Sequence, residues 1–525
     1  MRQAALLKQP RNSRRKLSGQ VSITSPVGGL NSRDSIADMK PEDAIQMDNW
    51  FPQTSDIRVR RGYSSHVTGL GAQVQSLMAY NKSDGTQKLY AAAGTSIFNV
   101  TSAGAVGSAE VTSLTNAKWQ HINYMDSSGT NWLCAFNGTD SPRYHNGSAW
   151  ITITASSTPA ITNVTTSLLD KPFTHKRRLW AVEKNSLSCW YLPADGVGGG
   201  AVEINLNGIV KRGGKIIAGG AWTIDAGEGL DDYWVAITSE GEVVVFEGTD
   251  PAAAATFSLV GVWHIGEPIG DRPMVKYGGD LLILTKQGVY PMSKALSSSD
   301  VAPNVAITDK IQADVSNASS LYSTNFGWQL FLFPQAEMLL LNIPEKVGSD
   351  QIQYAMNTLT GAWGRFTNIE ANCWELFGSD AYFGGNGKVF KFWSQDKDDT
   401  SNIDAEAKQA FSYFGSRGLI KHFKMIRPIL LSNGNPSFSA ALNVDYEDVP
   451  VNASLTFSPI TGGVWDTAVW DAGLWGGDLA VIRDWQTLVA VGTAAALRLQ
   501  SQSGGDANEL RWEATDFLYE VGDVL

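Results

Sequence analysis

The sequence predicts an all-β protein, and three of its features carry that prediction. The 525 residues include 52 glycines and 18 tryptophans but only 18% charged residues. A hairpin pattern returns about every 50 residues through the middle of the chain, and apolar and polar residues alternate in its last quarter. Many short strands joined by tight turns have this composition. Because the length exceeds what one simple core supports, we expect several domains, or one repeat with an appendage.

Residues 1–63 are predicted to form a basic, extended N-terminal arm. The first 33 residues contain seven basic side chains and no acidic one; the net charge is −11, so the rest of the chain carries −18 once these seven positive charges are set aside. We expect Arg11, Arg14, Arg15 and Lys16 to bind an acidic partner surface or nucleic acid. A solvated tail is the alternative, because the RNSRRK run is short and has no aromatic residue for base stacking.

Two further elements are expected in this arm before the repeats begin. In KPEDAIQMDNWFP, Pro41 followed by Glu42 and Asp43 predicts the first turn of one short helix. DIRVRRGY, residues 56–63, predicts a strand that leads into the first repeat. In a ring of sheets this strand would close the circle by pairing with the last sheet.

Residues 64–396 are predicted to form a ring of small antiparallel sheets. One unit keeps returning: an apolar strand, a turn rich in Gly, Asn, Asp or Ser, and a second apolar strand. Successive units start 43, 47, 55, 47, 49 and 51 residues apart. The units are KLYAAAGTSIFNV at residue 88, NWLCAFNGTDSPRYHN at 131, RLWAVEKNSLSCWYL at 178, YWVAITSEGEVVVF at 233, DLLILTKQGVYPM at 280, QLFLFPQAEMLLLNI at 329 and DAYFGGNGKVFKFW at 380.

A further strand-like stretch precedes several of these hairpins, such as VQSLMAY, WQHINYM, PMVKYG and NCWELFG. Three or four strands per repeat, six or seven times over, meet the requirement of a β-propeller, whose blades are small stacked sheets. Hairpin strands that are apolar on both faces fit blades covered on both sides. A β-sandwich array, whose repeats are usually about twice as long, is the alternative. The sequence therefore predicts a six- or seven-bladed β-propeller.

Residues 397–525 are predicted to form a separate, sandwich-like antiparallel β domain with one solvated face. The charged stretch SQDKDDTSN, which follows Trp393, indicates the boundary. Alternation then resumes at residues 403–408 and 438–447, where apolar side chains occupy every second position.

Three tryptophans in this C-terminal region, Trp465, Trp470 and Trp475, lie five residues apart in VWDTAVWDAGLWGGD. Five-residue spacing along a strand reverses the side-chain face at each step, so one continuous aromatic platform is not expected. We expect the three to be packing anchors, within one subunit or between neighbouring subunits, each burying roughly 150–250 Å². Ligand binding is the alternative.

The sequence contains no pattern that indicates catalysis, a cofactor or a metal, so we predict that the protein is not an enzyme. The six histidines lack HxH or HExxH spacing, and neither GxSxG nor GxxxxGK[ST] occurs. DSSGTNW, residues 126–132, is similar to the aspartate-box turn of sialidases, but Asp126 stands one position too far from Gly129 and the stretch occurs once. A hairpin turn is the expected structure there.

The cysteines and the hydropathy indicate the compartment. Cys134, Cys189 and Cys373 are odd in number and widely spaced in apolar stretches, which predicts buried free thiols and a reducing compartment. The first thirty residues lack an apolar signal-peptide core. The longest uncharged window, residues 147–169, has 11 Ser, Thr or Asn among its 23 positions, so no membrane span is expected.

Three stretches resemble the tail hub or nozzle proteins of short-tailed bacteriophages, also called packaged-DNA stabilisation proteins. They are GLNSRDSIADMKPEDAIQMDNWFPQTSDIRVRRGY (residues 29–63), FSYFGSRGLIKHFKMIRPILLSNGNPSFSAALNVDYE (residues 411–447) and the terminal WEATDFLYEVGDVL. The likeness covers both ends of the chain, and the propeller predicted between them agrees with it. These stretches are signatures of a family and not of a reaction.

The resemblance implies a structural virion protein built around a β-propeller. In that family six copies form a homohexameric ring below the portal and its adaptor, extend the DNA channel and retain the packaged DNA until ejection. The implied partners are further copies of the chain, the portal/adaptor connector, a tail fibre, needle or plug protein, and double-stranded DNA that passes without sequence recognition. The implied location is the virion tail, after assembly in the host bacterial cytoplasm. An acidic channel lining would let DNA slide without sticking.

Two other functions stay open from the sequence. A propeller glycosidase or depolymerase needs only two carboxylates a few ångströms apart and would use the tryptophans as sugar contacts. A receptor-binding tail protein would adhere to the cell surface, which a nozzle need not do.

Overall fold

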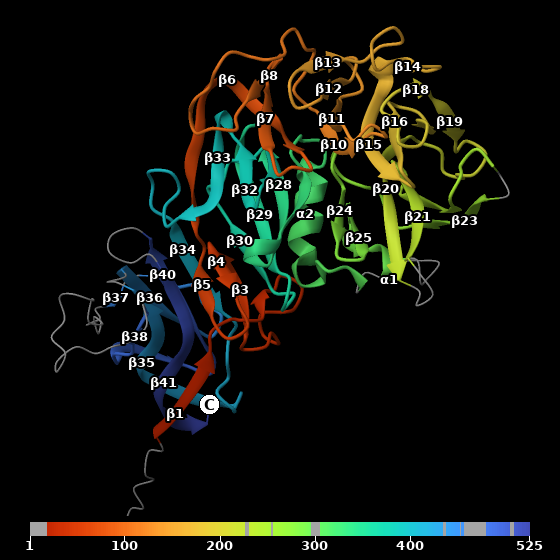
Figure 1. Ribbon diagram of the computed structural model, residues 1–525. Coiled ribbons are helices and arrows are strands. Elements are labelled where there is room, and N and C mark those ends of the chain that lie inside the picture. Colours follow the sequence, from red (N-terminus) through yellow and green to blue (C-terminus); the bar gives the residue numbers. More distant parts are fainter. Residues whose placement is uncertain are drawn as a thin grey trace, which may run out of the picture.

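The protein is mostly β, with a propeller-like ring of small sheets joined to a second body of larger sheets (Figure 1). The computed structural model describes residues 18–225, 230–253, 256–295, 305–433, 437–451, 453–455, 479–503 and 509–524. In this part of the chain the α-helices are α1 (Met292–Ala295) and α2 (Gln312–Tyr322).

Seven groups of antiparallel strands follow one another around the ring in the described residues. The first group is β6 (Gly62–Asn81), β7 (Gln87–Ala93) and β8 (Ser96–Asn99); the second is β10 (Gln120–Met125), β11 (Asn131–Phe136), β12 (Arg143–His145) and β13 (Trp150–Thr152); and the third is β15 (Leu169–His175), β16 (Arg178–Glu183), β17 (Ser188–Tyr191) and β19 (Val202–Asn205). The fourth group is β20 (Ile216–Asp225), β21 (Leu230–Thr238), β22 (Glu242–Gly248) and β23 (Phe257–His264), and the fifth is β24 (Met274–Tyr277), β25 (Asp280–Thr285) and β26 (Gly288–Pro291). The sixth group is β27 (Gln329–Phe333), β28 (Met338–Lys346), β29 (Ser349–Asn357) and β30 (Trp363–Phe366), and the seventh is β31 (Cys373–Phe377), β32 (Asp380–Gly384) and β33 (Asn386–Gln395). Short strands β9 (Gly104–Ala105), β14 (Ile161–Thr162) and β18 (Gly199–Gly200) lie in the connections. All seven predicted hairpins are confirmed.

One long strand, β6, closes the ring. Its first part pairs with β33 of the last group, where Tyr63 lies opposite Phe392, and its second part pairs with β7 of the first group. The beginning of the repeat is therefore tied to its end, as a propeller requires. Of the predicted closing strand DIRVRRGY, Gly62 and Tyr63 take part, whereas β5 (Ile57–Val59) belongs to the second body.

Hydrophobic clusters fill the spaces between successive sheets. Met78, Tyr90, Trp119 and Leu133, for example, pack together between the first and second groups. Further clusters of this kind occur around the ring, and a larger one joins the fifth and sixth groups to the second body. Because both faces of each sheet are covered, the middle strands contain continuous buried apolar runs, such as Leu133–Phe136 in β11 and Leu281–Leu284 in β25, and these runs do not alternate with polar residues.

The sixth repeat is shifted by one strand relative to the others. In the other groups the predicted hairpin supplies the second and third strands, but here it supplies β27 and β28, the first and second. Helix α2, with Val315 buried, precedes β27 in place of an upstream strand. The sequence did not predict this helix, because QADVSNASSLY has few strong helix formers and no regular apolar stripe.

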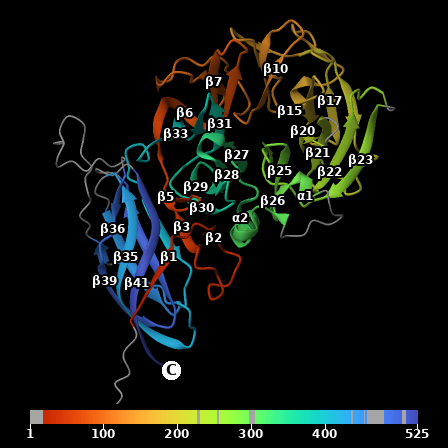
Figure 2. The same cartoon turned by 60° about the horizontal axis from the view of Figure 1, so that its bottom comes forward.

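The second body draws strands from both ends of the chain (Figure 2). One sheet contains β1 (Ser18–Thr24), β4 (Trp50–Pro52), β5, β35 (Leu419–Ser432), β38 (Ala480–Ile482), β39 (Gln486–Gly492) and β41 (Leu510–Val524). The other contains β2 (Gly29–Leu30), β3 (Asp43–Asp48), β34 (Asp404–Gln409), β36 (Ser437–Val444), β37 (Ala453–Leu455) and β40 (Ala495–Gln502), and it continues into β30 of the ring. The two stretches in which apolar and polar residues alternate form strands β34 and β36, as predicted. Their apolar residues Ala405, Ala407, Phe438 and Ala440 lie in the core.

The prediction of a short helix after Pro41 is wrong. Residues Asp43–Asp48 form strand β3, and Pro41 and Glu42 form the turn before it. Met47 of this strand lies opposite Ala407 of β34, and both side chains are fully buried. The acidic residues after a proline suit a helix start, but pairing with β34 across the core overrides that local preference.

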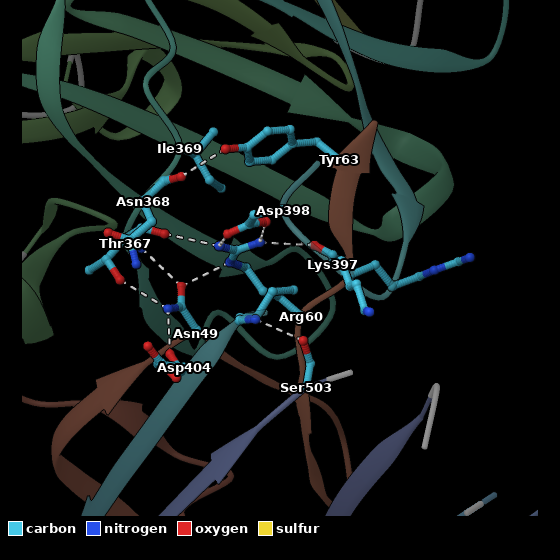
Figure 3. A network of polar contacts seen from close by, with 12 residues as sticks. Asn49, Arg60, Tyr63, Thr367, Asn368, Ile369, Lys397, Asp398, Asp404 and Ser503 are labelled. Carbon is cyan, nitrogen blue, oxygen red and sulfur yellow. Dashed lines mark hydrogen bonds and ion pairs between the residues drawn. The ribbon is translucent and has the colours of Figure 1, made fainter. Parts of the chain in front are cut away.

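A buried polar network joins the ring to the second body (Figure 3). Arg60 binds Asp398 with two hydrogen bonds, Nη1 to Oδ1 at 2.8 Å and Nη2 to Oδ2 at 2.6 Å, and both side chains are almost fully buried. Arg60 Nη2 also donates to the carbonyl of Thr367, and Nε donates to Oδ1 of Asn49. Asn49 Nδ2 in turn donates to the Asp404 carbonyl in β34. We call Asn49, Arg60, Thr367 and Asp398 the junction network.

The junction network holds a carboxylate that is poorly solvated. Burial raises the pKa of Asp398, and the hydrogen bonds from Arg60 oppose that rise without cancelling it. Removing Arg60 therefore leaves a buried acid without its cation, which costs more than the pair itself contributes.

We predict that Arg60→Met lowers the free energy of unfolding by about 3–5 kcal/mol, because Asp398 loses its partner inside the protein. Urea denaturation of the variant and the wild type measures this. Arg177→Ala is the matched control, since the Arg177–Asp195 pair lies at the surface with 79% of the arginine side chain exposed; it is expected to cost less than about 1 kcal/mol. Equal losses for the two variants would contradict the prediction.

Candidate functional site

A cavity of about 460 Å³ lies where inner strands of the ring converge. It is lined by residues of six groups, so it marks the centre of the ring and not a space between two sheets. We call it the axial cavity. Its polar and charged lining residues are Gln120, His121, Lys171, Asp271, Arg272, Lys276, Gln329 and Glu375.

Arg272, just before β24, fills one end of this centre. Its Nε donates to Oε1 of Gln120 at 3.2 Å, and its Nη1 donates to Oε1 of Gln329 at 3.1 Å. Its Nη2 donates to Oγ of Ser76 at 3.0 Å and to the carbonyl of Trp119 at 3.1 Å. One guanidinium thus reaches the first, second and sixth groups from the fifth, so it fixes inner strands that are far apart in the chain.

Gln329 extends this contact to the seventh group. Its Oε1 accepts from the backbone N–H of Trp374, and its Nε2 donates to the carbonyl of the same residue at 3.0 Å. A glutamine amide that pairs with both backbone groups of one residue acts like an additional strand at the end of β31. Arg272 and Gln329 together therefore connect five of the seven groups at the centre.

His121 and Glu375 form the second polar feature of the axial cavity. His121 Nε2 lies 3.7 Å from Oε1 of Glu375, and their side chains are 15% and 22% exposed. Burial raises the pKa of Glu375 to about 8, against the opposing charge of Arg272. Burial and the same arginine lower the pKa of His121 to about 3. At neutral pH both groups are therefore mostly uncharged, which leaves Arg272 as the charge at this level of the cavity.

A cluster of opposite charges lies at the side of the cavity next to β15. Lys171 Nζ lies 2.8 Å from Oδ2 of Asp170 and 4.0 Å from Oδ1 of Asp271. Burial acts to lower the pKa of this lysine, but the two carboxylates raise it overall. The lysine is therefore held as a cation among acids and is not a candidate nucleophile.

The chemistry of the cavity is that of a packed polar centre. Lys171 is paired with opposite charges, His121 and Glu375 are mostly neutral at pH 7, and Arg272 donates its hydrogen bonds to neutral acceptors. Among the described residues, no group of three or more His, Cys, Asp or Glu side chains is placed to hold a metal ion. The arrangement orients inner strands and restricts the opening at the centre of the ring.

The aspartate-box-like stretch is the turn between β10 and β11. Asp126 Oδ1 accepts from the backbone N–H groups of Ser128 and Thr130, and Oδ2 accepts from Nε1 of Trp132 at 2.8 Å. Both carboxylate oxygens therefore stabilise the hairpin, as expected. These hydrogen bonds contribute to the lowered pKa of Asp126.

The three cysteines are free and fully buried, which confirms the prediction of buried free thiols. Burial raises the pKa of Cys373 to about 11, so its thiol is protonated at neutral pH. No helix in the described part of the chain has the length and hydrophobicity that crossing a bilayer needs.

The residues singled out from the sequence lie elsewhere in the chain. Arg11, Arg14, Arg15 and Lys16 fall outside the described residues, and so do Trp465, Trp470 and Trp475. Arg272, which the sequence analysis missed, stands between Asp271 and Pro273 directly before the predicted strand PMVKYG, and a charged residue at the start of an inner strand was the available signal.

Comparisons with known proteins give distant likenesses. No family model matches the chain, and no curated protein matches it. Among solved structures, it is similar to YCF48 from Cyanidioschyzon merolae, with 11% identity over 65% of this chain and 97% of that one and a TM-score of 0.32. It is similar to YCF48 bound to D1 peptide with 9% identity over 68% of this chain and 96% of that one, and a TM-score of 0.33. It is similar to BBS1N in complex with ARL6DN with 13% identity over 46% of this chain and 72% of that one, and a TM-score of 0.30. The description of the ring therefore rests on its own strand pairing.

We predict that Glu375→Gln makes the stability of the protein less dependent on pH. In the folded wild type the pKa of Glu375 is about 8, above its ordinary value of 4.5. The unfolded chain therefore loses this proton first, and the wild type is progressively destabilised as the pH rises from the ordinary pKa through the folded one. The glutamine amide of the variant does not titrate in this range. Melting temperatures at pH 5 and pH 9 check this: the decrease between them should be smaller in the variant, and equal decreases would contradict it.

Proposed function

We propose that the protein is a structural component of a short phage tail that forms a ring, a nozzle or hub, and acts by assembly. The observation that carries the proposal is where the three stretches resembling such proteins lie. Residues 29–63 supply β2 to β5, residues 411–447 supply β35 and β36, and the terminal stretch supplies β41. β41 pairs with both β35 and β5. The resemblance therefore describes one folded body assembled from both ends of the chain.

The finer fold in this proposal is a seven-bladed β-propeller. Each of the seven strand groups is taken as one blade, and β6 supplies the outer strand of the last blade and the inner strand of the first. Such a closure ties the termini of the repeat together without a covalent link, which gives a rigid body.

The proposed DNA conduit lies between copies of the chain and not through one ring. Arg272, Gln120 and Gln329 fill the ring centre at one level, and the remaining axial cavity of about 460 Å³ has no room for a duplex. Six copies around a shared axis, below the portal and adaptor, would enclose a channel wide enough for DNA. The chain beyond residue 33 carries −18, which favours passage of a phosphate backbone without binding.

The remaining parts of the proposal concern partners and location. The basic arm with Arg11, Arg14, Arg15 and Lys16 would dock on an acidic surface of the adaptor. A tail fibre, needle or plug protein would bind the opposite end of the ring. The protein would reside in the virion tail after assembly in the host cytoplasm, without catalysis or a cofactor.

We predict that the full-length protein forms closed rings when it is mixed with its portal and adaptor proteins. Negative-stain electron microscopy and particle mass of the mixture measure this, and rings of six copies are expected. Removal of residues 1–17, which leaves all described strands intact, is expected to weaken docking on the adaptor without changing the fold. A protein that stays monomeric and never joins the connector would contradict the proposal.

A further inference from the structure

A smaller cavity of about 170 Å³ lies beside the axial cavity, at the face of the ring where inner strands β10, β15 and β20 begin. The two cavities have Gln120, Lys171 and Asp271 in common. The charged residues that line the smaller one carry a surplus of two positive charges, and they are Lys118, Lys171, Lys184, Lys215, Asp170 and Asp271. We call it the lysine pocket. In a chain with a net charge of −11, this is a local reversal of sign.

Lys171 is neutralised within the wall of the pocket. Its Nζ lies 2.8 Å from Oδ2 of Asp170 and 4.0 Å from Oδ1 of Asp271. It stands in β15 where the pairing with β16 shifts register between Asp170 and Phe173, and its φ is 48°, in the left-handed region that residues other than glycine rarely adopt. A bulge of this kind re-aims a side chain. Because two carboxylates offset this one lysine, the positive surplus belongs to the other three.

Two of those three lysines are held at the pocket by neutral oxygens. Lys184, in the turn between β16 and β17, donates from Nζ to Oγ1 of Thr139 at 2.7 Å. A Cβ added at Gly138 would meet Cδ of Lys184 at 3.0 Å, so the backbone there packs directly on the lysine stem. Lys215, directly before β20, donates from Nζ to Oδ1 of Asn185 at 2.9 Å. An ammonium has three protons, so both groups keep donors for a ligand.

The third, Lys118, lies just before β10, and its Nζ is 4.6 Å from the centre of the Phe326 ring. Among the described residues, none of the ion pairs with a carboxylate involves Lys118, Lys184 or Lys215. Like charges gathered around one pocket repel each other and concentrate anions from solution. A bound anion would therefore stabilise this arrangement.

Amide groups add neutral donors to the lysine pocket. Oδ1 of Asn116 accepts from the backbone N–H of Lys118, and Oδ1 of Asn185 accepts from Lys215. Since these two oxygens are already used, the NH₂ ends of the same amides are the ends that can donate to a ligand. Arg272 lies nearby in the axial cavity but directs its hydrogen bonds to the inner strands, so it contributes charge and not a contact.

We propose that the lysine pocket binds a phosphate group, held by Lys118, Lys184 and Lys215. A phosphate has several oxygens and up to two negative charges, so it accepts from several ammonium and amide donors at once, whereas a carboxylate has two oxygens and one charge. The cavity of about 170 Å³ is smaller than the roughly 300–1,000 Å³ that encloses a drug-sized ligand, so it suits one compact group.

The source of the phosphate is either a free phosphate or phosphate monoester, or the backbone of DNA at the face of the ring. Both present the same oxygens to the lysines. The site goes beyond the tail assembly proposed above, which requires no ligand, and it does not depend on it.

Isothermal titration calorimetry of the full-length protein at low ionic strength tests the site with three probes: inorganic phosphate, acetate and a short DNA duplex. Saturable binding of inorganic phosphate is expected, and added sodium chloride should weaken it. Acetate is expected to bind at least about tenfold more weakly, because a carboxylate makes fewer charge-assisted hydrogen bonds.

Two variants remove one ammonium each from exposed side chains. Lys184→Gln and Lys215→Gln are each expected to weaken phosphate binding about tenfold, and the double variant should abolish it. Lys346→Gln is the matched control, because Lys346 is exposed at the turn between β28 and β29 of the sixth group but does not line the pocket. Its affinity for phosphate should equal that of the wild type. Equal melting temperatures verify that all variants keep the fold.

The DNA probe distinguishes the two sources. Duplex that competes with phosphate on the wild type, and does not bind the double variant, identifies the DNA backbone; phosphate binding without duplex binding identifies the free group or a monoester. The proposal is overturned if phosphate shows no saturable binding, or if the double variant binds it unchanged. It is also overturned if Lys346→Gln loses as much affinity as Lys184→Gln, or if acetate binds as tightly, which would indicate a site for the carboxylates of an acidic peptide. None of these results bears on ring formation, which particle mass measures separately.

Discussion

The buried pairing of Arg60 with Asp398 is the interaction on which the arrangement of the protein depends. Arg60 stands between β5, which belongs to the second body, and β6, which closes the ring. Asp398 follows the last strand of the ring, and Thr367 follows β30. The chain therefore enters and leaves the ring at one buried point, where hydrogen bonds join the two bodies. In the proposed ring of copies, this junction would set how one copy meets the next.

The ring and the second body contribute different things to the proposed assembly. In the ring, Arg272 and Gln329 connect inner strands, so its own axis is filled at one level. The second body combines strands from both ends of the chain, among them the three stretches that resemble phage tail proteins. In the proposed assembly the channel lies between copies, because the centre of each ring is closed at one level.

The repeat was predictable because its signal is local. Hairpins such as KLYAAAGTSIFNV carry both strands and the turn within about fifteen residues, and each was found. The pairings of β3 with β34 and of β1 with β41 join residues more than 350 positions apart, and no local sequence pattern predicts such pairings. Asp43 after Pro41 therefore suggested a helix where a distant strand imposes β structure. Arg272 was missed for the same reason, since its hydrogen-bond partners come from the first, second and sixth groups of the ring.

Hydrogen exchange measured by mass spectrometry on the intact wild type and the Arg60→Met variant tests the coupling of the two bodies most directly. If the junction network holds them together, β6 and β33 in the ring and β34 in the second body should all lose protection in the variant, by similar free energies. Inner strands such as β20 and β21 should keep theirs. A variant in which β6 and β33 exchange as slowly as in the wild type while β34 opens would show that the ring closes without Arg60, and would contradict this account.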